Sequence, residues 1–350
     1  MTNALFVAVI AIVMAAIFLW GFRRLPDEGW QMIASVPMRK HADGHWQGLN
    51  LTYYGFFNAT AMAFACTMVL ILMSSIQASL RATVAVLTMG LLIALPMARI
   101  VARIVEGKRH TFTVGGAAFI LIIVLPWLIG LFNSIVGEPL GLSLPPRPML
   151  AAIVIAYAFG EALGRLACIS FGCCYGQALT QLPPFFATLL RRFSFVFTGQ
   201  TKKVSYEGRL AGKPVVAIQA LTSIVFAVGG LVGVLLFLES RWLGALVVPL
   251  AVTQLWRVAS ETLRADFRGG RRISAYQVMA ILGLLYGLAM LPFVGQAASS
   301  TPNLAYATRI FSNGWLLILI QLEWLLVFLY LGRSSVTTSR VSFWVMPDRV

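Results

Sequence analysis

Four charged residues lie inside strongly apolar stretches of the chain, where an isolated charge is costly. Glu161 and Arg165 are four residues apart, and so are Arg257 and Glu261. Residues at this spacing share one face of a helix and can neutralise each other. A charge at the centre of a bilayer costs roughly 2.5–3.5 kcal/mol. The two pairs are therefore either ion pairs that hold helices together or parts of a functional site.

Further arginines and glycines accompany these pairs. Arg165 is followed by Gly-Cys-Cys-Tyr-Gly at residues 172–176, and Arg257 is followed by Arg264 and Arg268. Guanidinium groups pair bidentately with phosphate oxygens, and glycine lets the backbone approach a ligand closely. This pattern predicts a phosphate-binding site at a membrane interface.

Three of the four cysteines crowd into one short stretch, at Cys168, Cys173 and Cys174, whereas Cys66 lies in a separate apolar tract. Zinc sites usually have four ligands in CxxC-like spacing, and the spacings here are five and one. We therefore expect no metal ion and no cofactor, and we interpret the three cysteines as small apolar residues that pack the loop. A redox pair is the alternative.

The composition indicates which fold must position these residues. Of the 350 residues, 59% are hydrophobic and 11% are charged, and the mean hydropathy is +0.85. A soluble domain has roughly 25% charged residues. Apolar tracts long enough to cross a membrane lie at 3–22, 51–76, 82–104, 112–133, 149–171, 215–238, 242–262, 274–295 and 313–332. We predict an all-α, polytopic transmembrane helical bundle of about nine spans.

The one sizeable polar insertion is 177–214, between the fifth and sixth spans, and we expect it to form a small polar subdomain. The net charge is +15. Membrane proteins collect lysine and arginine in their loops as topology determinants and lipid-headgroup contacts, so we expect no nucleic-acid partner. Residues 1–20 lack a basic leader and have too long an apolar run for a signal peptide, which indicates an uncleaved first span.

These motifs together resemble the prolipoprotein diacylglyceryltransferase family. Tyr54-Gly55 is similar to the Tyr-Gly that opens the first core helix of that family, and residues 164–176 resemble its Gly-Arg-x-Gly-Asn signature. Its late arginine-glutamate element resembles the residues Arg257, Glu261, Arg264 and Asp266. The likeness covers residues 51–295, so we interpret 1–50 and 296–350 as added spans with their loops.

The resemblance implies a transferase that moves the diacylglyceryl group of phosphatidylglycerol to a thiol or another nucleophile and releases glycerol phosphate. Arg165 and Arg257 would hold the phosphate. The substrate-binding residues that it implies are Tyr54, Gly115, Gly116, Gly164, Cys168, Gly176 and Arg264. The implied partners are phosphatidylglycerol and a lipoprotein precursor or other lipid acceptor, and the implied location is the bacterial cytoplasmic (inner) membrane, crossed several times.

The chain departs from the family where a base is needed. The family has a His-Gly-Gly motif whose histidine is the proposed base, and the equivalent here is Val114-Gly115-Gly116. Substitute bases are His110, then Glu161 or Glu261 if burial raises the carboxylate pKa. The alternative function is a non-catalytic phospholipid-binding or lipid-moving paralogue, which keeps the arginines without the base.

Charge and resemblance predict opposite orientations in the membrane. Loop 21–50 has four basic residues and 177–214 has six (Arg191, Arg192, Lys202, Lys203, Arg209 and Lys213). The positive-inside rule places such loops in the cytoplasm, whereas the resemblance implies that they face the exterior. In either case four spans separate the two loops, so we expect both on one face, and we favour the exterior.

Overall fold

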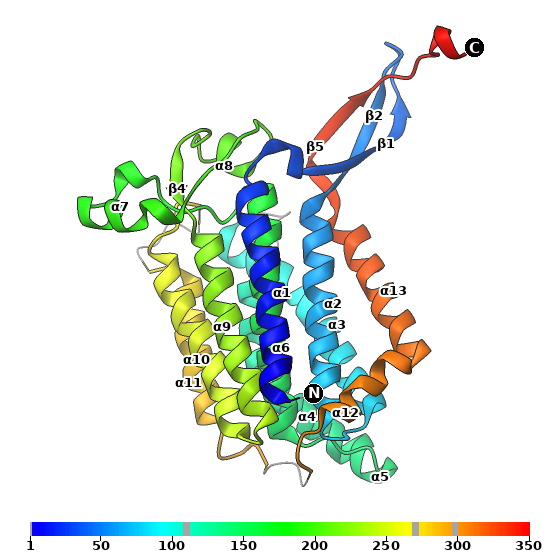
Figure 1. Ribbon diagram of the computed structural model, residues 1–350, viewed down its shortest axis with the longest axis vertical. Helices are drawn as coiled ribbons and strands as arrows, with labels where there is room; N and C mark the ends of the chain where they lie inside the picture. Colours follow the sequence, from blue (N-terminus) through cyan, green and yellow to red (C-terminus); the bar gives the residue numbers. More distant parts are fainter. Residues whose placement is uncertain (1, 108–112, 268–272, 296–299) are drawn as a thin grey trace.

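A computed structural model describes residues 2–107, 113–267, 273–295 and 300–350 of the chain. The chain is mostly helical, at 69%, and its long helices run side by side in one bundle (Figure 1). Eight of the described helices are long and apolar enough to cross a membrane: α1 (Asn3–Arg24), α2 (Tyr53–Ser75), α3 (Leu80–Glu106), α4 (Val114–Phe132), α6 (Pro146–Phe171), α9 (Ile218–Leu238), α10 (Trp242–Glu261) and α13 (Gly314–Leu331). The chain is therefore a multi-pass membrane protein.

The ninth apolar tract forms a shorter helix than we predicted. Helix α11 (Ala275–Ala289) begins at a capping box between Ser274 and Gln277 and has 15 residues. At 1.5 Å per residue it reaches about 22 Å, less than the roughly 30 Å of a hydrocarbon core. Residues 290–293 are apolar but form turns. Among the described residues, eight helices are long enough to span a membrane and α11 is a shorter apolar helix, so the predicted count of about nine spans is not confirmed.

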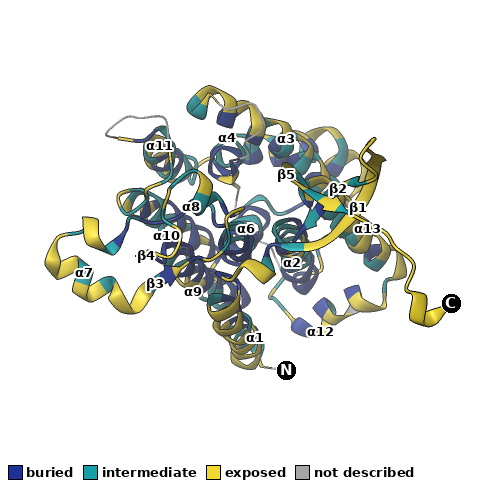
Figure 2. Ribbon diagram, turned by 90° about the horizontal axis from the view of Figure 1, so that it is seen from above, coloured by how far each residue is buried: buried dark blue, intermediate teal, exposed yellow. Residues whose placement is uncertain are grey.

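Helices α2 and α6 form the centre of the bundle. In each, 61% of the most apolar 18-residue window is buried, against 17% in α1 and 6% in α13; Figure 2 shows the same contrast from above. Close approach of α9 to α6 depends on glycine. A Cβ atom at Gly230 would lie 3.0 Å from Phe159, and one at Gly233 would lie 2.7 Å from Ile155. Helix α6, at the centre of the bundle, therefore packs closely against α9.

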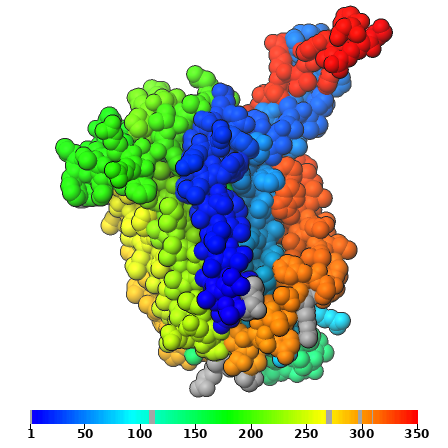
Figure 3. Space-filling view, in the orientation of Figure 1, coloured from blue at the N-terminus to red at the C-terminus, as the bar shows by residue number. Residues whose placement is uncertain are grey.

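Three strands rise from one end of the bundle as a projecting arm (Figures 1 and 3). They are β1 (Met32–Lys40), β2 (Trp46–Thr52) and β5 (Arg333–Val341), paired antiparallel in the order β1-β2-β5. The prediction of an all-α chain is wrong in this respect. Residues 46–52 precede the second span, so α2 begins at Tyr53 rather than at residue 51.

The 177–214 insertion forms short elements at the same end: α7 (Pro184–Leu190), β3 (Ser194–Val196), α8 (Lys203–Tyr206) and, just beyond it, β4 (Pro214–Val216). Two further short helices, α5 (Glu138–Leu140) and α12 (Leu304–Ala307), lie at the opposite end (Figure 1). Buried Gln31 donates from Nε2 to the carbonyl of Thr201 at 2.9 Å. The prediction that loops 21–50 and 177–214 share a face is therefore confirmed.

Candidate functional site

One face of α6 carries three polar side chains in a row. Tyr157, Glu161 and Arg165 are four residues apart, so they project from the same side of the helix. Glu161 is 6% exposed and forms an ion pair with Arg165. A buried carboxylate of this kind persists only when it is paired, and the pair that we predicted from spacing is present.

Arg257 of α10 joins this row from the neighbouring helix. Its Nη2 atom donates to Glu161 Oε2 at 3.1 Å and also to the Tyr157 hydroxyl. One carboxylate thus contacts two buried guanidinium groups. We paired Arg257 with Glu261 along its own helix, whereas the structure shows an ion pair between helices, from Arg257 to Glu161. Arg165 and Arg257, which the resemblance implies would hold one phosphate, line the same pocket.

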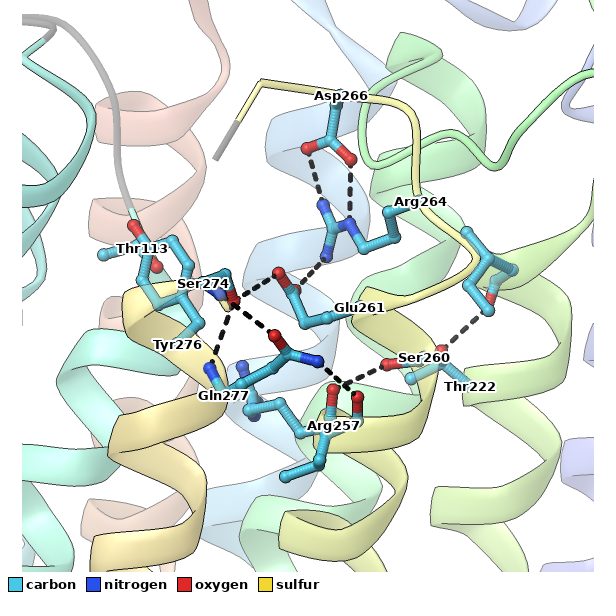
Figure 4. Close-up of polar contacts among 12 residues, drawn as sticks. Thr113, Thr222, Arg257, Ser260, Glu261, Arg264, Asp266, Ser274, Tyr276 and Gln277 are labelled. Carbon is cyan, nitrogen blue, oxygen red and sulfur yellow. Dashed lines mark hydrogen bonds and ion pairs between the residues drawn. The ribbon is translucent and has the colours of Figure 1, made fainter. Parts of the chain in front are cut away.

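A second charged group lies just beyond the end of α10 (Figure 4). Arg264 donates from Nε and Nη2 to the two oxygens of Asp266 at 2.8 and 2.7 Å, and its Nη1 lies 3.4 Å from Glu261 Oε1. Glu261 also accepts from the Ser274 hydroxyl at 3.1 Å. Burial alone would lower the pKa of Arg264, but the Asp266 carboxylate raises it well above its usual range. Arg264 is therefore a fixed positive charge.

The carboxyl end of α6 folds back on itself and gathers three cysteines. Gly172 has φ +72° and donates to the carbonyl of Ile169, and the Cys173 amide donates to the carbonyl of Cys168 at 3.0 Å. This is a Schellman motif, which needs a left-handed residue after the helix. Cys174 is also left-handed, at φ +55°. The sulfur atoms of Cys168, Cys173 and Cys174 all lie within 4.8 Å of one another.

The loop that carries these thiols is held by neighbouring elements. Gln219, at the start of α9, donates from Nε2 to the carbonyl of Cys173 at 2.8 Å. The backbone amide of Ala265 donates to the carbonyl of Tyr175 at 3.1 Å, and Gly176 forms a bridge with Arg264. A Cβ atom at Gly176 would lie 2.5 Å from a backbone oxygen of Val216. Because Gly176 has no side chain, its backbone can pack closely against that of Val216 next to the site.

The start of α4 makes room for Arg257. A Cβ atom at Gly115 would lie 2.3 Å from Arg257 Nη1, and one at Gly116 would lie 2.4 Å from Val101 of α3. Gly115 therefore contacts the site directly, and Gly116 packs α4 against α3. Val114 begins the helix and is 38% exposed. The predicted base His110 lies outside the described residues.

The arginines and the thiol loop line a small, partly open pocket. We call it the arginine pocket; its lining includes Arg165, Cys174, Gln219, Arg257, Glu261 and Arg264. Within the described part of the chain, the Nε atoms of Arg165 and Arg257 and the Oε1 atom of Gln219 are buried without a hydrogen-bond partner. Each such group costs about 1–3 kcal/mol. Two unpaired guanidinium donors at one pocket call for an anionic acceptor.

The structure has a second, larger and apolar pocket. It is lined by residues of α4, α6, α10, α11 and the turns that follow α11. Its fourteen lining residues are apolar except Tyr157. The Tyr157 hydroxyl accepts a hydrogen bond from Arg257, which lines the arginine pocket, so one residue contact links the linings of the two pockets.

The remaining predicted site residues lie near the thiols or in packing positions. The centre of the Tyr54 ring lies 5.6 Å from that of Phe171, with the two rings tilted by 60°, and Tyr54 is an electrostatic neighbour of all three cysteines. A Cβ atom at Gly55 would lie 2.1 Å from the backbone of Gly332, so the Tyr-Gly motif also joins α2 to the end of α13. A Cβ atom at Gly164 would meet only ordinary contacts, Asn58 Oδ1 at 3.8 Å being the nearest.

Sequence reasoning overlooked two residues. Tyr157 precedes Glu161 by four, the same helical spacing that identified Arg165, so the signal was present in the sequence. Glu323 lies within α13, and its two carboxylate oxygens are buried without a hydrogen-bond partner in the described residues. It was detectable as an acidic residue inside an apolar span.

No protein-family model matches the chain, and no curated protein matches it either.

Proposed function

We propose that this protein binds phosphatidylglycerol and transfers its diacylglyceryl group to a thiol or another nucleophile, with release of glycerol phosphate. The observation that carries the proposal is that Arg165 and Arg257, each with a buried Nε atom that has no hydrogen-bond partner among the described residues, line one pocket, and that Arg257 contacts Tyr157 of an apolar pocket. A phospholipid likewise combines an anionic phosphate group with apolar acyl chains. The geometry thus supports an amphiphilic anion better than a soluble metabolite.

The charges in the pocket suit a leaving phosphate. Arg165 and Arg257 share the single carboxylate of Glu161, so each keeps donor capacity for oxygens of a ligand. Donors that are fixed before the reaction stabilise charge that develops in the transition state without having to reorganise. When the bond to the glyceryl carbon breaks, one more negative charge develops on the phosphate oxygens. Arg165 and Arg257 would hold that charge.

A non-catalytic phospholipid-binding paralogue is the second candidate, and one observation favours it. The position of the family histidine is Val114, whose apolar side chain begins α4. A transferase must deprotonate a thiol of pKa near 8.5, and valine cannot accept that proton. Binding without transfer would need only the arginines and the apolar pocket.

Lipid mass spectrometry distinguishes the two candidates. The full-length protein is incubated in detergent with phosphatidylglycerol and a cysteine-containing lipopeptide precursor, and released glycerol phosphate and diacylglyceryl thioether are measured. Both products are expected, and both should disappear with Arg165→Ala. Binding of phosphatidylglycerol without either product would support the paralogue. If phosphatidylglycerol and phosphatidylcholine bind equally weakly to the wild type and Arg165→Ala, both candidates fail.

A further inference from the structure

We propose that Cys168, Cys173 and Cys174 bind one zinc ion, whose fourth coordination position is left for the acceptor thiol beside the arginine pocket. The catalytic part of this inference rests on the proposed transferase function, whereas the metal site does not. Spacing along the chain argued against zinc, but the fold brings the three sulfur atoms within 4.8 Å of one another.

The distances suit a metal with small adjustment. Three sulfur atoms around zinc, with bonds of about 2.3 Å, lie roughly 3.8–4.0 Å apart. The sulfur atoms here therefore need to close by about 1 Å at most. Thiolates favour soft or borderline metals, zinc among them, over magnesium and calcium. The site as found is nearly the size that the ion requires.

The backbone holds the thiols in this arrangement by two left-handed residues. Gly172 at φ +72° turns the chain back along α6, and Cys174 at φ +55° turns it again. A left-handed conformation is uncommon for a residue other than glycine, and such residues cluster at functional sites. Packing of three small apolar side chains would not require a cysteine in this conformation.

The charges around the cluster favour a thiolate complex. Arg165 interacts electrostatically with Cys168 and Cys174, Lys203 interacts with Cys173 and Cys174, and Arg264 interacts with Cys174. Three thiolates and one Zn²⁺ carry a net charge of −1. Neighbouring cations stabilise that charge, which three neutral thiols would not have.

A zinc ion with three protein ligands keeps one position open for a substrate. A thiol that coordinates zinc loses its proton, which passes to solvent. Its sulfur would then form a bond with the carbon of the diacylglyceryl group that carries the phosphate oxygen of phosphatidylglycerol. The bond between that carbon and the phosphate oxygen breaks, and its electron pair leaves with glycerol phosphate. Cys174 lines the arginine pocket, so thiolate and leaving group would meet there, and zinc would replace the base that Val114 cannot supply.

The test begins with metal content. The full-length protein is purified in detergent under reducing conditions, stripped with a chelator and titrated with Zn²⁺, with bound metal measured by mass spectrometry. We expect one zinc ion per chain. Cys173→Ser and Cys174→Ser should each weaken binding at least tenfold, because even the loss of an outer-shell partner of a metal ligand typically costs 10–100-fold in affinity. Cys66→Ser is the matched control and should bind as the wild type does, because Cys66 lies in α2 and interacts with Glu323 instead.

Equal zinc uptake by the wild type and a Cys168→Ser/Cys173→Ser/Cys174→Ser variant would overturn the metal site. If the serine variants fail to fold, Co²⁺ loaded into the wild type decides the question. Intense thiolate-to-cobalt absorption supports the site, and its absence refutes it.

The catalytic role is tested separately. The stripped wild type should still bind phosphatidylglycerol but release glycerol phosphate at least a hundredfold more slowly, and added Zn²⁺ should restore the rate. Arg165→Ala should keep its zinc and lose transfer. Full transfer by the stripped protein would refute the catalytic role of zinc. Zinc binding without any transfer by the wild type would refute the proposed function and leave the metal site standing.

Discussion

Arg165 differs from an ordinary buried ion-pair arginine in one respect. It is bonded to Glu161 through Nη2, while its Nε is buried with no partner in the described residues. A structural ion pair would be satisfied by a single positive charge at this position. A phosphate site requires the planar fork of the guanidinium group.

We therefore expect Arg165→Lys to bind phosphatidylglycerol at least tenfold more weakly than the wild type. Lysine keeps the charge but loses bidentate hydrogen bonds worth about 1.5–3 kcal/mol. Binding is measured by titration with the lipid in detergent. Arg241→Lys is the control, since Arg241 has a side chain 70% exposed and pairs with Glu239. Equal affinity of Arg165→Lys and the wild type would mean that only the charge matters.

Gly115 provides a second test at the scale of one residue. Gly115→Ala places a methyl group 2.3 Å from Arg257 Nη1, so the guanidinium group must move. We expect phosphatidylglycerol binding to fall about tenfold or more with little change in helical content. Gly130→Ala is matched, because it lies on the same helix and its Cβ atom would have no neighbour within 4 Å. Equal losses for both variants would show a general effect on α4.

At the scale of elements, Lys202 fastens the 177–214 insertion to two helix ends. Its Nζ donates to the carbonyl of Leu25 after α1 at 3.0 Å and to that of Ser170 in α6 at 2.7 Å. The side chain is fully buried. Burial lowers the pKa of Lys202 from its usual 10.5 to about 8. The positive charge is therefore less stable in the folded state than in the unfolded chain.

The stability of the protein should consequently rise between about pH 8 and pH 10.5. Below pH 8 Lys202 is charged in both states and the burial cost is fully present. Above pH 10.5 it is neutral in both and the cost is gone. At about 1.4 kcal/mol per pKa unit, the gain is about 3 kcal/mol. Thermal unfolding in detergent measures it, with Lys202→Met as the reference; the same pH profile in both proteins would contradict this assignment.

Helices were more predictable from the sequence than strands. Hydropathy located the eight long helices but extended α11 through apolar turns, because a hydropathy sum is blind to backbone conformation. The β1-β2 hairpin left a local signal, an Asp43-Gly44 turn with Gly44 at φ +84°. In the site, spacing predicted Glu161–Arg165 correctly. It could not predict the pair between Arg257 and Glu161, or the convergence of three thiols, because both depend on how α6 meets α10 and on the left-handed turn after α6.

For the whole molecule, the charge pattern and the proposed function predict opposite orientations in the membrane. The 177–214 insertion and the strand arm lie at one end of the bundle (Figure 1), and the arginine pocket is lined by residues near the ends of α6 and α10 that lie toward this end. That end carries the basic loops, which the positive-inside rule places in the cytoplasm. A transferase for secreted lipoproteins requires the opposite.

We expect this end to face the exterior. Ala211 is exposed in the insertion, and Glu138 is exposed in α5 at the opposite end. With an impermeant thiol reagent, Ala211→Cys should be labelled on intact cells above the wild-type background, and Glu138→Cys only after permeabilisation. The reverse pattern would exclude a secreted lipoprotein as the acceptor and would point to a cytoplasmic nucleophile.

The pairing of β2 with β5 also constrains how the protein is made. The Thr338 hydroxyl donates to the carbonyl of Gly48, 290 residues earlier. At 5–20 residues per second, β2 leaves the ribosome roughly 15–60 s before its partner is synthesised. The arm is therefore among the last parts to assemble, after all the membrane helices have been translated. A ribosome that stalls before residue 333 would release a bundle in which the edge of β2 is open to pairing with other chains.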